Sequence, residues 1–211
     1  MPPLDADPGE AAEPVEGVFR TLAEDDASFA MCTAALTEAG ATFTEGLEAV
    51  TAEDADCGIA RPVRVTEIAP GVTLIPEAIL RCETALALAD WTTRHVIPAA
   101  EVLDTRGRLS ALELGGSYTC RRRNNLPTGK LSEHSFGNAV DIMAFRFEEG
   151  EPIRVEPRMD EGSIEEAFQR AARATSCLHF TTVLGPGTDE AHADHLHMDV
   201  AARNGGYRLC Q

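Results

Sequence analysis

One segment of the sequence, residues 132–141, places a histidine and an aspartate where they could share a metal ion. The segment reads SEHSFGNAVD, and six residues separate His134 from Asp141. Gly137 lies between them and permits a sharp turn, so a loop histidine and a strand aspartate can converge. Imidazole and carboxylate are both ligands that zinc accepts in proteins.

A second segment, residues 192–197, reads HADHLH and contains three histidines. Residues two apart in a strand point to one face, so His195 and His197 share a side. Catalytic zinc sites use three protein ligands and keep one position for water. His197 completes that count with His134 and Asp141. His195 then lies beside the open position, where it can act as a general base.

Alternating apolar and polar residues predict several strands, and helical patterns lie before and between them. The predicted strands span residues 63–68, 109–118, 139–147, 180–184 and 196–200. A first helix ends at Gly40, and a second begins at Pro76 and ends or kinks at Pro98. A capping box at Ser163 and Glu166 begins a third helix. This order of elements predicts an α+β domain.

The chain has 211 residues, of which 44% are hydrophobic, and this suits one packed domain with a tail. Residues 1–16 are rich in Pro, Ala and acidic residues and are predicted to be a solvated tail or linker, while residues 17–211 form the domain. The formal net charge of −17 would repel phosphate backbones, so no nucleic-acid partner is expected. No apolar run approaches the roughly 18 residues of a membrane span.

Six dispersed cysteines without a CxxC pair predict three disulfides in an oxidising compartment. The alternative is a set of buried free thiols in a cytosolic protein. Order along the chain suggests the pairs Cys32–Cys57, Cys82–Cys120 and Cys177–Cys210. No signal peptide is visible after Met1, so we expect a mature form whose leader is missing.

Several longer motifs resemble those of known families. The segments GSYTCR at 116–121, SEHSFGNAVDI at 132–142, TVLGPG at 182–187 and YRLCQ at 207–211 resemble the bacterial extensin-like protein C-terminal domain family, over about residues 18–211. The two histidine segments are similar to those of the LAS metallopeptidases, a group that includes D-Ala-D-Ala peptidases, lysostaphin-type enzymes and the hedgehog domain. The spacing in residues 192–197 is closest to the penicillin-insensitive murein endopeptidases.

This resemblance implies a LAS/hedgehog-like fold with a small antiparallel sheet of about four strands, flanked by helices. The implied zinc ligands are His134, Asp141 and His197. His195 would be the base that activates the zinc-bound water, and His192 would stabilise the oxyanion or orient the substrate. Arg121 would meet a substrate carboxylate or carbonyl. This sequence departs from the Gly-Tyr-Arg element of the D-Ala-D-Ala group at that point, so Arg122 is a rival.

The expected function is that of a zinc-dependent peptidase acting on peptidoglycan peptides in the periplasm or another extracytoplasmic compartment. The alternatives are a zinc-containing cell-envelope binding module without turnover and a zinc-stabilised structural domain. Three residues have open roles. Asp199 either orients an imidazole or is exposed at a strand end, Glu133 is an alternative base, and Tyr118 is either a donor in the cleft or a core residue.

Overall fold

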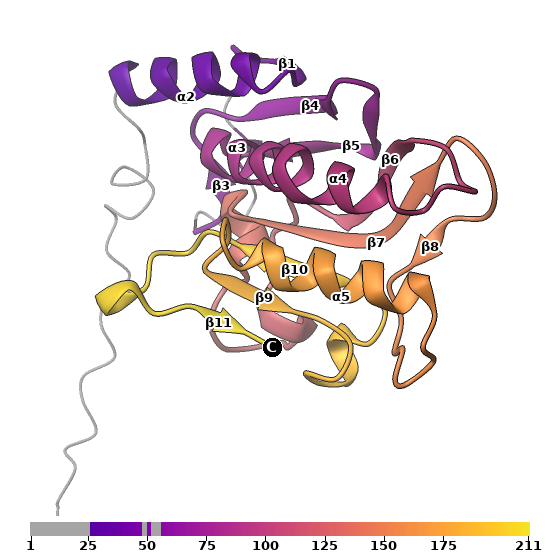
Figure 1. The fold of residues 1–211 in the computed structure, drawn as a ribbon. Helices are drawn as coiled ribbons and strands as arrows, with labels where there is room; N and C mark the ends of the chain where they lie inside the picture. The colour runs from indigo at the N-terminus through magenta and orange to yellow at the C-terminus, as the bar shows by residue number, and fades with distance from the viewer. Residues whose placement is uncertain (1–25, 48–49, 52–55) are drawn as a thin grey trace, which may run out of the picture.

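The computed structural model describes residues 26–47, 50–51 and 56–211, and these residues form a large β-sheet with helices on one face (Figure 1). The strands of this sheet are β1 (Thr42–Thr44), β4 (Val63–Ala69), β5 (Val72–Leu80), β6 (Leu109–Gly116), β7 (Ala139–Phe147), β8 (Ile153–Arg154), β9 (Thr182–Leu184), β10 (Leu196–Asp199) and β11 (Leu209–Cys210). Their order is β1-β4-β5-β6-β7-β10-β9-β11, and β8 pairs with β7. Strands β2 (Val50–Thr51) and β3 (Gly58–Ile59) form a separate two-stranded sheet. The α+β class is confirmed, whereas the tail predicted at residues 1–16 and the domain start at residue 17 lie outside the described residues.

The main sheet is larger than the antiparallel sheet of about four strands that the sequence predicts. It has nine strands within the described residues, and two of its pairs, β5–β6 and β9–β11, are parallel. Strands β1, β8 and β11 contain only two or three residues each, too few to show alternation in the sequence. Pairing with longer neighbours therefore defines these strands.

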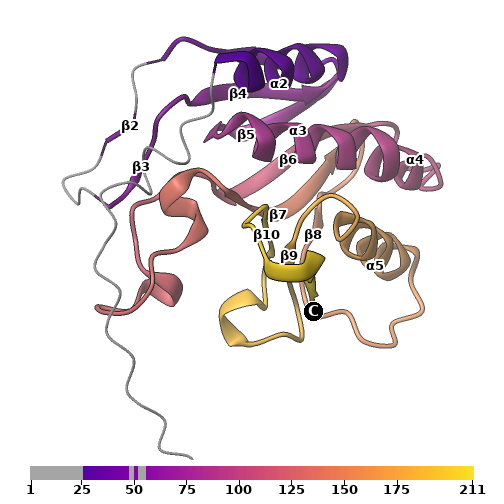
Figure 2. The same cartoon turned by 90° about the vertical axis from the view of Figure 1, so that its left-hand side faces the viewer.

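Three helical segments cover one face of the sheet. They are α2 (Asp26–Glu38), α5 (Ile164–Ser176), and a continuous segment made of α3 (Cys82–Trp91), a π-helical stretch (Thr92–Val96) and α4 (Ile97–Ala100). Figure 2 shows these helices on one side, with the loops before β7 and β10 on the other. The predicted helix signals at Gly40 and Ser163 are confirmed: Gly40 has φ +83°, and the Ser163 hydroxyl accepts from the Glu166 N–H at 3.1 Å. No helix in the described part of the chain is long and apolar enough to cross a membrane.

The second helix begins later than the sequence predicts. Pro76 lies inside β5, and α3 starts only at Cys82. The pairing of β4 with β5 shifts register between Val65 and Glu67, and the pairing of β5 with β6 ends at Ile75. Proline has no N–H to donate, so it is tolerated in a strand where a ladder bond is missing. Pro98, expected to end or kink the helix, instead follows the π-helical stretch within α4.

One apolar core joins the helices to the sheet and fixes the central strands. Trp91 is fully buried within it, and its Nε1–H donates to the Ala172 carbonyl oxygen at 3.0 Å. The ring of Phe145 on β7 packs edge-to-face on Trp91 and on Phe168 of α5. Because β7 is anchored in this way, residues on its opposite face have a rigid support.

All six cysteines form disulfides. The pair Cys177–Cys210 agrees with the prediction, but the other two pairs, Cys32–Cys82 and Cys57–Cys120, differ from the predicted pairs Cys32–Cys57 and Cys82–Cys120. Cys32 lies on the buried face of α2, which packs against α3, and α3 begins at Cys82. Helix packing, and not order along the chain, selects these partners.

Candidate metal centre

The three predicted ligands, His134, Asp141 and His197, converge in the structure with buried side chains. Asp141 Oδ1 lies 2.9 Å from His197 Nδ1 and 3.2 Å from His134 Nε2, and the two ring nitrogens are 3.2 Å apart. Ligand atoms about 2.0–2.1 Å from a tetrahedral zinc ion lie about 3.3–3.4 Å from one another. The spacing and chemistry of this metal-binding triad therefore fit a metal ion.

Two neighbouring strands and one turn position the triad. Asp141 on β7 and His197 on β10 are direct partners in the antiparallel register. Val140 and Ile142 beside Asp141 belong to the apolar core, so Asp141 faces away from the helices. His134 comes from the 3-10 helix η3 (Glu133–Phe136), which ends at Gly137.

Gly137 makes the turn that brings His134 to β7. Its φ of +67° lies in the left-handed region, and a Cβ at this position would collide with the Ile59 side chain. The Gly137 carbonyl oxygen also accepts from the Arg81 N–H at 3.1 Å and the Thr84 hydroxyl at 2.9 Å. The sharp turn predicted at this glycine is confirmed, and no other residue would make it without strain.

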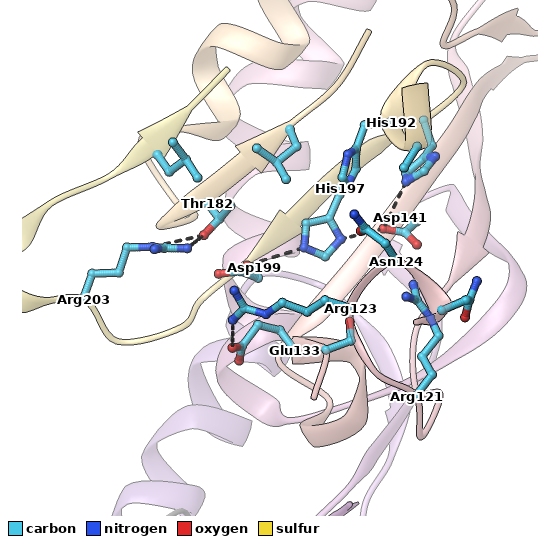
Figure 3. Close-up of a pocket in the computed structure, with 16 residues that line it drawn as sticks. Arg121, Arg123, Asn124, Glu133, Asp141, Thr182, His192, His197, Asp199 and Arg203 are labelled. Carbon is cyan, nitrogen blue, oxygen red and sulfur yellow. Dashed lines mark hydrogen bonds and ion pairs between the residues drawn. The ribbon is translucent and has the colours of Figure 1, made fainter. Parts of the chain in front are cut away.

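An acceptor lies at the outer ring nitrogen of each ligand histidine. His134 Nδ1–H donates to the Ser117 carbonyl oxygen at 2.6 Å, and His197 Nε2 lies 3.4 Å from Asp199 Oδ2. A histidine that donates outward keeps a lone pair on its inner nitrogen, which is the state that a metal needs. Asp199 is only 3% exposed. Of its two predicted roles, the geometry supports orientation of an imidazole (Figure 3).

Opposite charges stabilise the metal-free triad. Burial raises the pKa of Asp141, but hydrogen bonds from His134 and His197 outweigh burial and hold that pKa well below its usual range. Burial lowers the pKa of His197, but hydrogen bonds to Asp141 and Asp199 outweigh it and raise the pKa to about 9. A metal ion that binds His197 must therefore displace a proton.

We expect the metal-free protein to lose stability as the pH rises from 6.5 to 9. The pKa of His197 is about 9 in the folded state and 6.5 in the reference state, so folding favours the protonated ring. The stabilisation is complete below pH 6.5, and about 3 kcal/mol is lost as the pH passes 9. Urea unfolding of chelator-treated protein across this range measures the loss. His197→Ala should flatten the profile, and a flat profile in the unsubstituted protein would contradict the assigned pairing.

Asp199→Asn should weaken metal binding by about 10- to 100-fold, because the neutral amide holds the His197 ring less firmly than the carboxylate. Competition with a chelating dye gives the dissociation constant. Asp189→Asn is the matched control, since Asp189 accepts from His192 at 2.6 Å and touches no member of the triad. Equal affinities for all three proteins would show that Asp199 does not support the metal ligand.

Two members of the triad, Asp141 and His197, line a pocket of about 420 Å³ that His192 and His195 also line, whereas His134 is buried and does not line it. His195 Nε2 lies 3.8 Å from Asp141 Oδ1, and His195 Nδ1 pairs with Asp194 Oδ1 at 2.8 Å. His192 Nδ1 pairs with Asp189 Oδ1 at 2.6 Å. Both rings thus have Nδ1 held by a carboxylate, which leaves Nε2 available to other groups.

The pocket distinguishes the alternative residues predicted from the sequence. Arg121 lines it, whereas Arg122 donates to a backbone carbonyl in its own loop and does not line the pocket. Glu133 also lines the pocket, but its carboxylate accepts from Asn138 at 3.0 Å and from Arg123 at 3.4 Å. These bonds occupy both oxygens of Glu133 and make it a poorer base than His195.

Tyr118, which the sequence left as either a donor in the cleft or a core residue, does not line the pocket, and neither do the two remaining histidines, His95 and His179. The Tyr118 hydroxyl is buried and has no hydrogen-bond partner among the described residues. His95 and His179 contact each other, with ring centroids 5.1 Å apart. The pKa of His179 is lowered, and burial of its ring is the largest cause. None of the three side chains reaches the triad through a contact that the structure describes.

Sequence reasoning missed several residues of the pocket wall. Asn124 and Asn125 both line the pocket, and both have positive φ. Adjacent asparagines are a recognisable signal for such a backbone. Thr182 and Arg203 also line the pocket, and the Arg203 guanidinium donates to the Thr182 hydroxyl at 3.1 Å. Arg203 lies in no motif, so nothing local in the sequence points to it.

The fold and the site together define a disulfide-linked α+β domain with a buried His-Asp-His centre that can hold a metal ion. Residues 30–211 match the family described as "Extensin-like protein C-terminus", and the chain belongs to this family. This agrees with the resemblance found in the sequence motifs. No curated protein and no solved structure matches the chain significantly.

Proposed function

We propose that the protein is a zinc-dependent peptidase that acts on peptidoglycan peptides in the bacterial cell envelope. The observation that carries the proposal is the triad of His134, Asp141 and His197 beside a pocket, which Asp141 and His197 line together with two more histidines. A zinc ion held by the triad would polarise the scissile carbonyl and lower the pKa of a water molecule at its open position. The peptidoglycan substrate follows from the resemblance to murein-cleaving LAS enzymes.

The residues of the pocket have complementary tasks in this proposal. His195 accepts the proton of the attacking water at Nε2, because Asp194 holds its Nδ1–H and stabilises the imidazolium that forms. His192, paired with Asp189, presents Nε2–H in its charged form and stabilises the developing oxyanion. Arg121 has no guanidinium hydrogen bond or ion pair with the described residues, and in this proposal it binds a substrate carboxylate.

The three disulfides support a location outside the cytoplasm, because such bonds persist in oxidising compartments. The periplasm combines such an environment with access to peptidoglycan. Two of the bridges hold the pocket walls. Cys57–Cys120 adjoins Arg121, and Cys177–Cys210 adjoins Leu209, which also lines the pocket. Reduction would therefore disturb the substrate site as well as the overall fold.

Zinc-loaded protein incubated with purified peptidoglycan tests the function. Separation of the released muropeptides by chromatography and mass spectrometry should show loss of particular peptide bonds. The control is His195→Ala protein with its zinc content verified. If the muropeptide profile is unchanged and the zinc-loaded protein sediments with peptidoglycan, the peptidase proposal is wrong and the protein is a non-catalytic binding module.

A further inference from the structure

The pocket contains two arginines that have no carboxylate partner among the described residues. Three acidic residues line it, and all three have partners: Glu133 pairs with Arg123, Asp141 pairs with the two ligand histidines, and Asp199 pairs with His197. The arginines that line the pocket are Arg121, Arg123 and Arg203. Only Arg123 has a carboxylate partner among the described residues. Two unmatched guanidinium groups therefore remain in a protein of net charge −17, in which most of the surface repels anions.

The two unmatched arginines lie on opposite sides of His197, as Figure 3 shows. Arg121 comes from the loop after β6, and Arg203 comes from the segment after β10. Arg203 uses Nε and Nη2 to contact the Thr182 hydroxyl. An arginine has five N–H donors, so about three remain for a ligand in the pocket.

The segment that carries Arg203 is fixed at both ends. Before it, the Val200 N–H donates to the Asn138 carbonyl oxygen at 3.1 Å. After it, the Leu209 N–H donates to the Thr181 carbonyl oxygen at 2.9 Å, and the Cys177–Cys210 disulfide closes the segment. A guanidinium on so constrained a segment loses little freedom when it binds an anion.

We propose that Arg203 is a second carboxylate-binding residue of this pocket, across the metal-binding triad from Arg121. The ligand is then an extended acidic peptide, with one carboxylate on each side of the bond that lies over the triad. The proposal deepens the peptidase function and rests on it for the peptide nature of the ligand. Guanidinium binds carboxylate through two parallel hydrogen bonds, so Arg203 would select substrates by charge as well as by position.

The test measures binding of a purified cross-linked muropeptide and of the same muropeptide after amidation of its carboxylates. Calorimetry with zinc-loaded protein in the His195→Ala background keeps the probe intact. Arg203→Gln should weaken binding of the free acid by about 10- to 100-fold and binding of the amide by less than about twofold. Arg121→Gln with Arg203→Gln should multiply the two losses, because each arginine binds its own carboxylate. Arg94→Gln, an exposed change of equal charge, should alter neither affinity.

Two results would overturn the proposal. The first is an equal loss for free acid and amide that Thr182→Val reproduces, which would make Arg203 a positioning residue acting through Thr182. The second is a double variant no weaker than the single variants, which would assign one carboxylate to both arginines. Neither readout requires turnover. Absence of muropeptide cleavage would therefore contradict the peptidase function, but the charge selectivity of Arg203 could still be measured.

Discussion

His195→Ala should retain one metal ion per chain and lower peptide turnover by a factor on the order of 10²–10⁴. The reason is geometric: His195 Nε2 faces Asp141 at 3.8 Å without belonging to the triad, and Asp194 fixes its other nitrogen. The ring can therefore move a proton without holding the metal. Metal analysis by mass spectrometry and initial rates on muropeptides check both halves of the expectation.

His197→Ala separates the two roles, because it should lose the metal together with all activity. Three protein ligands are the minimum for such a site, and His197 contacts both of the other two. His95→Ala is the control, since that histidine contacts His179 away from the pocket and should change neither quantity. If His195→Ala strips the metal as fully as His197→Ala, His195 is a fourth ligand. The site would then be closed to water, which favours a structural or binding role.

Removal of the Cys57–Cys120 bridge by alanine at both positions should lower the free energy of unfolding by about 4 kcal/mol. The bridge spans 63 residues, and the estimate follows from the entropy that such a loop regains in the unfolded chain. Muropeptide affinity should also fall, because Arg121 directly follows Cys120. Urea denaturation and calorimetry measure the two effects. The denatured, unreduced parent protein should show no titratable thiol.

The Cys32–Cys82 bridge provides the matched comparison, since it spans 50 residues and joins α2 to α3 away from the pocket. Its removal should cost nearly the same stability and leave muropeptide affinity unchanged. Equal losses of affinity in the two double variants would show that global loosening, and not the position of Arg121, controls binding.

The metal-binding triad was predictable because its signals are local. His134 and Asp141 flank a turn that only glycine makes easily, and alternation along a strand assigns His197 to one face. The apolar neighbours of Asp141 also predict that its side chain lies on the face of the sheet opposite the helices. Residue types and short spacings were therefore sufficient for these three side chains.

Features that depend on tertiary packing could not be read in the same way. Cys32 pairs with Cys82 because two helices pack together. Pro76 is tolerated in β5 because it lies in the stretch between Thr73 and Ala78 where the pairing of β5 with β4 is irregular. Arg203 lies in the segment between β10 and β11. Because β11 pairs in parallel with β9, this segment runs back along the sheet and brings Arg203 to the pocket. To predict each of these features, one must know which distant segments of the chain become neighbours, and no local sequence pattern gives that information.

The place of Asp141 and His197 within the sheet has a consequence for how long a bound ion would remain. Strand β7 lies between β6 and β10, and β10 lies between β7 and β9. Interior strands open only at a free energy close to that of global unfolding. Local opening of the strands that hold Asp141 and His197 would therefore not release an ion, and we expect exchange to proceed through the mouth of the pocket. Its lifetime would then depend on whether a competing chelator is small enough to enter, as well as on affinity.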